Sequence, residues 1–346
     1  MGFLKTLVTW VFVLAFIVAA GLVAGWAWLN NEMTKPGPLA QEVIFTVSDG
    51  ETLTSVAARL EDDGIIADRQ VLLTKSRIEA QMGGEQPHVK TGEYIIEPHI
   101  SVAGVMSILI EGRSVLHRIT LPEGRTTAQL LRVIEADEIL EGEMPEVLPE
   151  EGSLLPDTYM YHRGMTRTQL IEKAQKAQAD LLAELWPERQ EGIPVTTPYE
   201  AVILASIVER ETGIAAERDE IAALFTTRLK KGMRLQSDPT IIYGISKGEP
   251  LYNKQGQRRT LYRSEIDRHT DWNTYQIDGL PITPICNPGR EAIAAVLNPP
   301  ETEYIFFVAD GKGGHLFAKT LAEHNRNVAA YRAFERKEIE RERQGE

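Results

Sequence analysis

Glu209 is the residue whose type and surroundings most strongly suggest chemistry. It lies in the run LASIVERET, residues 204–212, which has the spacing of a helix. Its helix face carries small and apolar residues one and two turns earlier: Ser206, Ala205, Val202 and Ala201. Burial among such side chains disfavours the ionised carboxylate and raises its pKa. We therefore interpret Glu209 as a candidate general acid that holds a proton near neutral pH.

A plainer interpretation leaves Glu209 ionised and solvated at a helix edge, paired with Arg210 or Arg228. A strongly raised carboxyl pKa costs folding free energy, which proteins usually tolerate only for function. The stretch by itself leaves both interpretations open. Two neighbouring acids, Glu200 and Glu211, are expected to point away from the apolar face.

Capping signals and periodicity predict the elements that position this carboxyl. A capping hydroxyl at Thr197 and a proline at position 198 open its helix. Other helices are expected at 128–136, 166–185, 218–231 and 328–343. The last of them ends in alternating charges, which are typical of a solvated surface.

The second half is otherwise expected to be rich in loops, beginning with 233–244. This loop gathers polar side chains in one short segment: Gln236, Ser237, Asp238, Thr240 and Tyr243. Such groups form hydrogen bonds with sugar hydroxyls, and tyrosine also stacks on a sugar ring. Further polar turns are expected at 150–159, 273–275 and 284–289. The alternative is that all these residues satisfy the backbone of their own turns.

Composition narrows the classes of function. The chain has 50 acidic and 37 basic residues, and its net charge at pH 7 is -13. It lacks a basic run with interleaved aromatic residues, so we do not expect it to bind nucleic acid. The single cysteine, Cys286, excludes an internal disulfide, and neither CxxC nor HExxH occurs. We expect no metal and no cofactor.

The amino-terminal segment predicts a membrane anchor. Residues 7–29 form an uncharged apolar run that as a helix measures about 34 Å, against about 30 Å for the hydrocarbon core of a bilayer. Trp26 and Trp28 lie near one end, as in an interfacial aromatic belt. A cleaved signal peptide would have a shorter apolar core. Lys5 favours residues 1–6 in the cytoplasm and the rest of the chain on the other side.

Residues 30–40 contain prolines and a glycine and are predicted as a linker. A small α+β region follows at 41–121. Its expected elements are strands at 43–47, 92–96 and 116–121, with helices at 52–60 and 102–110. The run VSDGETLTSVA resembles the opening of a LysM module, a βααβ fold that binds the N-acetylglucosamine backbone of cell-wall glycans. A structural spacer is an equal alternative.

Six motifs carry a more specific resemblance: EGSLLPDTY, LASIVERET, LQSDPTIIYG, NTYQIDGLP, PICNPG and GGHLFAKTLAEHN. They resemble the MltG/YceG-like family of endolytic murein transglycosylases over about the last two hundred residues. The resemblance implies an α+β protein with a transmembrane helix, the LysM-like subdomain and a larger mixed α/β catalytic domain at 122–346. It also implies a single-pass inner-membrane enzyme that faces the periplasm and limits the length of nascent glycan strands. Ile282 departs from the pattern, because the family often has a second proline there.

By this resemblance, Glu209 is the catalytic glutamate. The residues implied to line the substrate site are Gln236, Ser237, Asp238, Tyr243, Asn287 and Asn325. The implied substrate is the glycan strand of peptidoglycan, and peptidoglycan synthases are candidate partners.

The implied chemistry is cleavage of the β-1,4 bond between N-acetylmuramic acid and N-acetylglucosamine, with Glu209 as proton donor. A hydrolase needs a second carboxylate, about 5 Å away as nucleophile or about 6.5–9.5 Å away as base. A lytic transglycosylase needs one carboxylate only, because the muramyl C6 hydroxyl attacks C1 and forms a 1,6-anhydro end. Asp238 is the candidate second carboxylate, and our hypothesis is that it positions substrate. The alternatives are a muramidase-type hydrolase and a non-catalytic scaffold that binds the cell wall.

Overall fold

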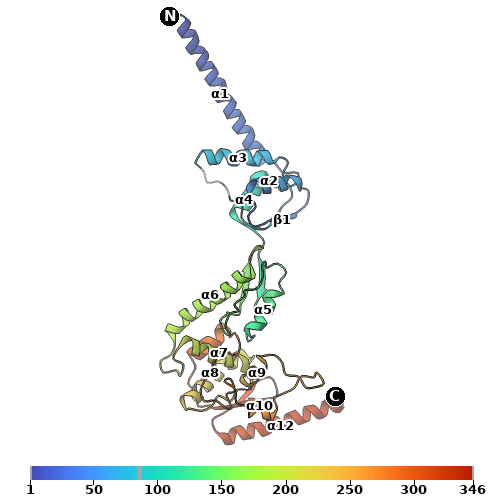
Figure 1. Ribbon diagram of the computed structural model, residues 1–346, viewed down its shortest axis with the longest axis vertical. Helices are drawn as coiled ribbons and strands as arrows, with labels where there is room; N and C mark the ends of the chain where they lie inside the picture. The colour runs from blue at the N-terminus through green and yellow to red at the C-terminus, as the bar shows by residue number, and fades with distance from the viewer. Residues whose placement is uncertain (1, 84–87, 345–346) are drawn as a thin grey trace. The chain divides into compact units, whose positions relative to one another are not determined.

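The computed structural model describes residues 2–83 and 88–344. The chain divides into two compact units. The first comprises Met1–Arg118, Ile139–Glu141 and Met160–Met165, and the second comprises Ile119–Glu138, Gly142–Tyr159 and Thr166–Glu346. Helices and short antiparallel strand pairs make up both (Figure 1), so the α+β class predicted from the sequence is confirmed.

Helix α1 (Gly2–Thr34) contains the apolar segment. Its part from Leu7 to Thr34 is long and apolar enough to cross a membrane. The prediction of a linker from residue 30 is wrong for its first five residues, because α1 continues to Thr34. The reason is packing: Leu29 and Met33 are buried in the core of the first unit, and Lys75 donates to the side chain of Asn30 at 2.9 Å.

The first unit has the element order β1 (Val43–Val47), α2 (Leu53–Asp62), α3 (Arg69–Gln81), β2 (Gly92–Ile96) and α4 (Val102–Glu111). Strands β1 and β2 pair antiparallel, with Val43 opposite Ile96. Alternate residues of each strand, such as Phe45 and Tyr94, enter the core. The predicted strands at 43–47 and 92–96 are confirmed, as are the helices at 52–60 and 102–110 within two residues. The likeness to a LysM module stays a prediction.

The segments that lead into the second unit follow the predicted capping signals. Strand β3 (His117–Thr120) pairs with β4 (Thr158–Tyr161). Helix α5 (Thr127–Glu135) begins with a capping box at Thr126, and α6 (Arg167–Leu185) begins with one at Thr166. A short 3-10 helix, Trp186–Glu188, follows α6.

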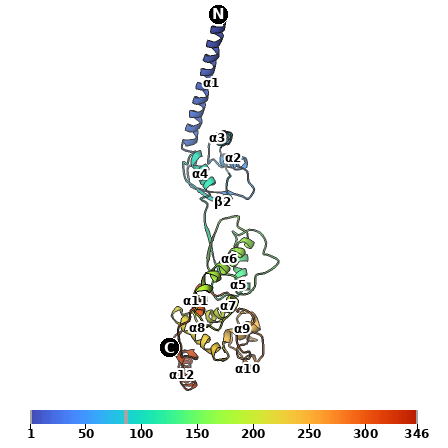
Figure 2. The ribbon, with the colours of Figure 1, turned by 90° about the vertical axis from the view of Figure 1, so that its left-hand side faces the viewer.

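Three packed helices form the centre of the second unit: α7 (Pro198–Glu211), α8 (Ala215–Lys230) and α11 (Arg290–Leu297). Figure 2 shows α11 beside α7 and α8. Thr197 caps α7, as predicted, and accepts the N–H of Glu200 at 3.1 Å. The α7 residues 201–208 are all buried, so this helix is fixed on several sides before its last turn, which carries Glu209.

The remaining elements of the second unit are α9 (Asp238–Ser246), α10 (Arg263–Ile266), β5 (Phe306–Ala309), β6 (His315–Ala318) and α12 (Leu321–Gln344). The prediction of a loop throughout 233–244 is wrong, because α9 begins at Asp238. Proline in its first turn supplies the fixed φ angle of a helix start. The final helix begins at Leu321, seven residues before the predicted start.

A buried polar cluster holds the segment before α9 against α7 and α8. Arg228 is 5% exposed and donates to the carbonyl oxygens of Leu235 at 2.6 Å and Ile305 at 2.7 Å. The carboxyl of Glu211 also lies here, with its Oε1 atom buried. The expected direction of Glu211, away from the apolar face that carries Glu209, is compatible with this position in a polar cluster.

The pKa of Glu211 is raised to about 7, chiefly by burial and also by the nearby charge of Asp238. The Ser237 hydroxyl and the charges of Arg228 and Arg210 act in the opposite direction. Folding thus favours the protonated, neutral form of this carboxyl near neutral pH.

This pKa predicts how stability depends on pH. The unfolded chain releases the Glu211 proton near pH 4.5, whereas the folded protein retains it up to about pH 7. The associated stability is complete below the unfolded pKa and is lost as the pH rises to about 7. Relative to Glu211→Gln, wild type should lose at most about 3 kcal/mol of unfolding free energy over this range. Urea unfolding of the full chain in detergent micelles measures the difference. The exposed control Glu191→Gln should follow wild type, and equal pH dependence of all three proteins would refute the assignment.

Candidate active site

Glu209 lies in the last turn of α7, where residues 285–289 run along the helix. Its Oε2 atom accepts the N–H of Gly289 at 3.2 Å. One turn earlier, the Ser206 hydroxyl accepts the N–H of Ile285 at 3.0 Å, and the Cys286 thiol donates to the Ser206 carbonyl at 3.3 Å. The segment is therefore held to α7 at several points, which fixes one oxygen of the candidate acid.

The pKa of Glu209 is raised, and burial is the largest cause. The Gly289 N–H, which donates to the ionised form, lowers it, and the negative charge of Glu123 raises it. Arg218 and Arg210 lower it by smaller amounts. The net upward shift of the pKa agrees with the interpretation of Glu209 as a general acid. Neither Arg210 nor Arg228 forms an ion pair with it among the described residues.

Glu123 belongs to the turn Pro122-Glu123-Gly124, which packs beside Glu209. Its Oε1 atom occupies the space where a side chain at position 289 would lie, so any larger residue there would displace Glu123. Gly124 has a φ of +69°, and a Cβ atom there would lie 3.6 Å from Cγ of Glu209. The Gly124 carbonyl accepts from Arg210 at 3.1 Å. The turn thus places a second carboxylate next to the candidate acid.

Asn287 joins three segments around the site. Its Oδ1 atom accepts the N–H of Leu154 at 3.0 Å. Its Nδ2 atom donates to the Arg125 carbonyl, the Thr127 hydroxyl and Oε1 of Glu151, at 3.2, 3.0 and 3.3 Å. The side chain is fully buried, so the geometry shows it positioning the 285–289 segment. A role in binding substrate stays a prediction.

Glu151 is a third carboxyl in this region, and it anchors Tyr243. Its Oε1 accepts the N–H of Thr127 at 2.7 Å, and its Oε2 accepts the Tyr243 hydroxyl at 3.0 Å. Burial raises the pKa of Glu151, although these donors lower it. Tyr243 is 7% exposed and packs edge-on against Trp272. The tyrosine therefore presents little surface, and its predicted contact with substrate is untested.

The predicted site residues before and within α9 are fixed by the segment at 274–275. The N–H groups of Gln236 and Ser237 donate to the carbonyl and the hydroxyl of Thr274, at 3.2 and 2.9 Å. Asp238 is exposed and accepts the Tyr275 hydroxyl at 2.8 Å. Gln236 is exposed, whereas Ser237 is fully buried.

Asn325 is exposed on α12, and none of its contacts connects it to Glu209 among the described residues. The structure thus brings Glu209 together with Gly289 and Glu123, and it links Tyr243 to Asn287 through Glu151. The roles of the predicted substrate residues stay predictions.

Sequence reasoning missed three charged residues near the site: Glu123, Glu151 and Arg218. The first two precede glycines at 124 and 152, in segments from which the sequence predicted only the start of the catalytic domain at 122 and a polar turn at 150–159. The part of the chain that the structure describes has no group of three or more His, Cys, Asp or Glu residues placed to hold a metal ion.

Known proteins resemble this chain along most of its length. The model of the YceG-like family matches residues 45–330. A Bacillus subtilis (strain 168) protein named endolytic murein transglycosylase is 27% identical over 321 residues, covering 84% of each chain. A Streptococcus pneumoniae (serotype 2, strain D39) protein of the same name is 24% identical over 375 residues, which cover 92% of this chain and 65% of that protein.

A solved structure of a YceG-like protein from Listeria monocytogenes covers 83% of this chain and 98% of its own, with 23% identity and a TM-score of 0.48. The family match spans both units of the fold and contains Glu209, Glu123 and the 285–289 segment. This chain belongs to the YceG-like family.

Proposed function

We propose that this protein is an endolytic murein transglycosylase that cleaves the β-1,4 bond between N-acetylmuramic acid and N-acetylglucosamine within glycan strands. The observation that carries the proposal is the Glu209 carboxyl, which has a raised pKa and one oxygen held by the Gly289 N–H. The names of the Bacillus and Streptococcus relatives support the same activity.

In the proposed mechanism, protonated Glu209 donates its proton to the glycosidic oxygen as the bond to C1 breaks. The resulting carboxylate then accepts the proton of the muramyl C6 hydroxyl, whose oxygen attacks C1. The products are a free hydroxyl on the leaving sugar and a 1,6-anhydromuramic acid end. Burial and Glu123 favour the protonated form that begins the cycle, whereas the Gly289 N–H and Arg218 stabilise the carboxylate formed in the middle.

A muramidase-type hydrolase remains the second candidate function, because a specific observation favours it. Hydrolysis needs a second carboxylate, and Glu123 lies next to Glu209, whereas Asp238 contacts Tyr275 and influences Glu211. In our proposal, Glu123 acts through its charge on Glu209 and forms no bond to the sugar.

The proposal divides the predicted substrate residues into two groups. Gln236, Asp238 and Asn325 are exposed and would contact the glycan. Ser237, Tyr243 and Asn287 are buried and would position the loops that carry these contacts. We propose that the substrate is the nascent glycan strand and that peptidoglycan synthases, which elongate it, are partners.

We also propose a cellular location and a membrane orientation for the enzyme. The single candidate membrane helix among the described residues, α1, would anchor the chain in the inner membrane. The amino terminus would lie in the cytoplasm and the catalytic unit in the periplasm, on the side where peptidoglycan is located.

Glu209→Gln tests the proposed chemistry. Glutamine keeps the shape of the side chain but cannot donate the proton, so turnover should fall by about two to four orders of magnitude. Mass spectrometry of the products from purified peptidoglycan should find 1,6-anhydromuramic acid ends with wild type and with the exposed control Glu191→Gln. Reducing ends from wild type would indicate a hydrolase. Equal products from wild type and Glu209→Gln would refute the role of Glu209.

Glu123→Gln tests the electrostatic role of the second carboxylate. Because a like charge raises the pKa of Glu209, its removal should lower that pKa. The general acid must be protonated, so the alkaline limb of kcat/KM against pH should move to lower pH, with a several-fold loss on that limb and little change at acidic pH. Glu135→Gln, an exposed change on α5, is the control. Loss of activity at every pH would contradict a purely electrostatic role and favour Glu123 as a reacting group.

A further inference from the structure

The second unit contains a polar pocket that shares no lining residue with the Glu209 site. Its volume is about 530 Å³, and it lies between the outer face of α8 and the segment 299–303. Thr226, Thr227 and Lys230 contribute to it from α8, where positions three and four apart share one face. Gln190 and Glu301 contribute from the loops on either side.

Hydrogen bonds hold the walls of this pocket, and among its lining side chains Thr302 and Glu303 take part, Glu303 through an ion pair with Lys319. The N–H of Gln190 donates to the Leu297 carbonyl at 2.9 Å. Arg228 holds the Ile305 carbonyl at 2.7 Å. Thr302 bonds to Glu220 of α8 through its hydroxyl, and Pro299 and Pro300 stiffen the same segment. The pocket is therefore organised without a ligand.

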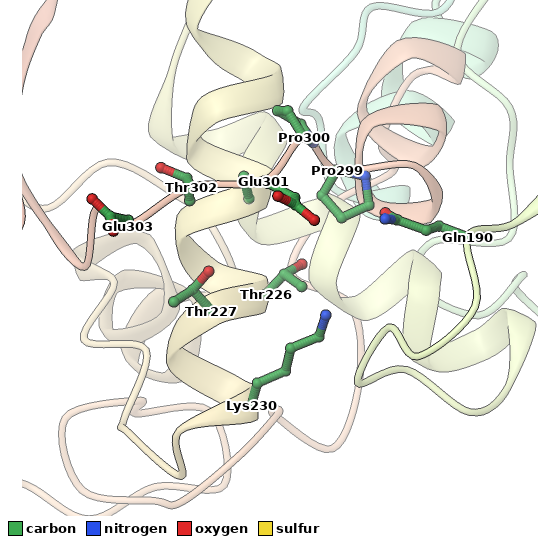
Figure 3. Close-up of a pocket in the computed structure, with 10 residues that line it drawn as sticks. Gln190, Thr226, Thr227, Lys230, Pro299, Pro300, Glu301, Thr302 and Glu303 are labelled. Carbon is green, nitrogen blue, oxygen red and sulfur yellow. The ribbon is translucent and has the colours of Figure 1, made fainter.

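Four polar side chains of the lining have no partner within the part of the chain that the structure describes: the exposed Gln190, Lys230 and Glu301, and the buried Thr226. Lys230 and Glu301 form no ion pair there, and the Gln190 amide has no hydrogen bond. The Thr226 hydroxyl is buried, because the residue is 4% exposed, and it also lacks a partner. Buried polar groups in proteins are normally satisfied. Figure 3 shows the ends of Gln190, Lys230 and Glu301 pointing toward the same space.

These groups define the chemistry of a ligand. An ammonium and a carboxylate on opposite walls fit a ligand that carries both charges. The amide and hydroxyl groups between them fit peptide N–H and C=O groups. No aromatic side chain is present among the described lining residues to stack on a sugar ring. The lining therefore favours a short zwitterionic peptide over a glycan.

We propose that this pocket binds the stem peptide of murein, with Lys230 on a carboxylate and Glu301 on the free ammonium of an uncross-linked peptide. The choice of the murein peptide rests on the proposed function, whereas the zwitterionic peptide chemistry rests on the pocket itself. Binding there would hold a peptide-bearing strand while another part of the same strand occupies the Glu209 site.

Calorimetric titration of the full chain in detergent micelles tests the proposal directly. The probe is the tetrapeptide L-alanyl-γ-D-glutamyl-diaminopimelyl-D-alanine. Wild type should bind it, and Lys230→Met and Glu301→Gln should each weaken the Kd at least tenfold, because each removes one charge contact. The controls are Lys231→Met, at the next position but outside the pocket, and Glu191→Gln. Both should bind like wild type. Absence of binding by wild type, or equal binding by the pocket variants, would refute the proposal.

A kinetic comparison separates this proposal from the proposed function. Lys230→Met should raise KM several-fold on peptide-bearing strands, and leave kcat and the cleavage of strands stripped by an amidase unchanged. Glu209→Gln should bind the tetrapeptide like wild type. If Glu209→Gln cleaved normally while the pocket variants lost the peptide, the catalytic proposal would fail and the pocket would stand. Glu209→Gln could instead be inactive while Lys230→Met equals wild type in the kinetics on both substrates and in the titration. In that case the peptide-binding proposal would fail and the catalytic proposal would stand.

Discussion

The close packing of residues 285–289 against α7 is the constraint on which the site depends. Ser206 is fully buried, and it holds this segment through its hydroxyl and its carbonyl. The same segment brings the Gly289 N–H to Glu209 and leaves room for Glu123 only because position 289 lacks a side chain. A bulkier residue at 206 or 289 would separate the acid from its donor and from the neighbouring charge.

Three carboxyls, those of Glu151, Glu209 and Glu211, differ in their hydrogen-bond partners, although burial raises the pKa of each. Glu151 is surrounded by donors and ties Tyr243 to Asn287. Glu211 is enclosed in the cluster around Arg228 and favours its neutral form. Glu209 has one oxygen bound and the other without a hydrogen bond among the described residues. This difference makes Glu209 the carboxyl with an atom available to a substrate.

Local signals were sufficient to predict much of the fold from the sequence. Capping residues such as Thr197 and Thr166 and the alternation in 43–47 located their elements within a residue or two. The helical spacing of small and apolar residues before Glu209 also predicted its apolar surroundings. Glu123 is 86 residues away from Glu209 along the chain, and no periodicity connects the two. Helix α9 was missed because its polar start has the composition of a turn.

The proposed proton transfer depends on the raised pKa of Glu209, which direct titration of its carboxyl measures. Full-length protein labelled with ¹³C at the glutamate carboxyl carbons can be followed by NMR against pH, and the signal absent from Glu209→Gln identifies the residue. We expect this signal to titrate above the ordinary value of about 4.3 for glutamate, and closer to that value in Glu123→Gln. Titration of Glu209 at or below the ordinary value would contradict its role as the proton donor.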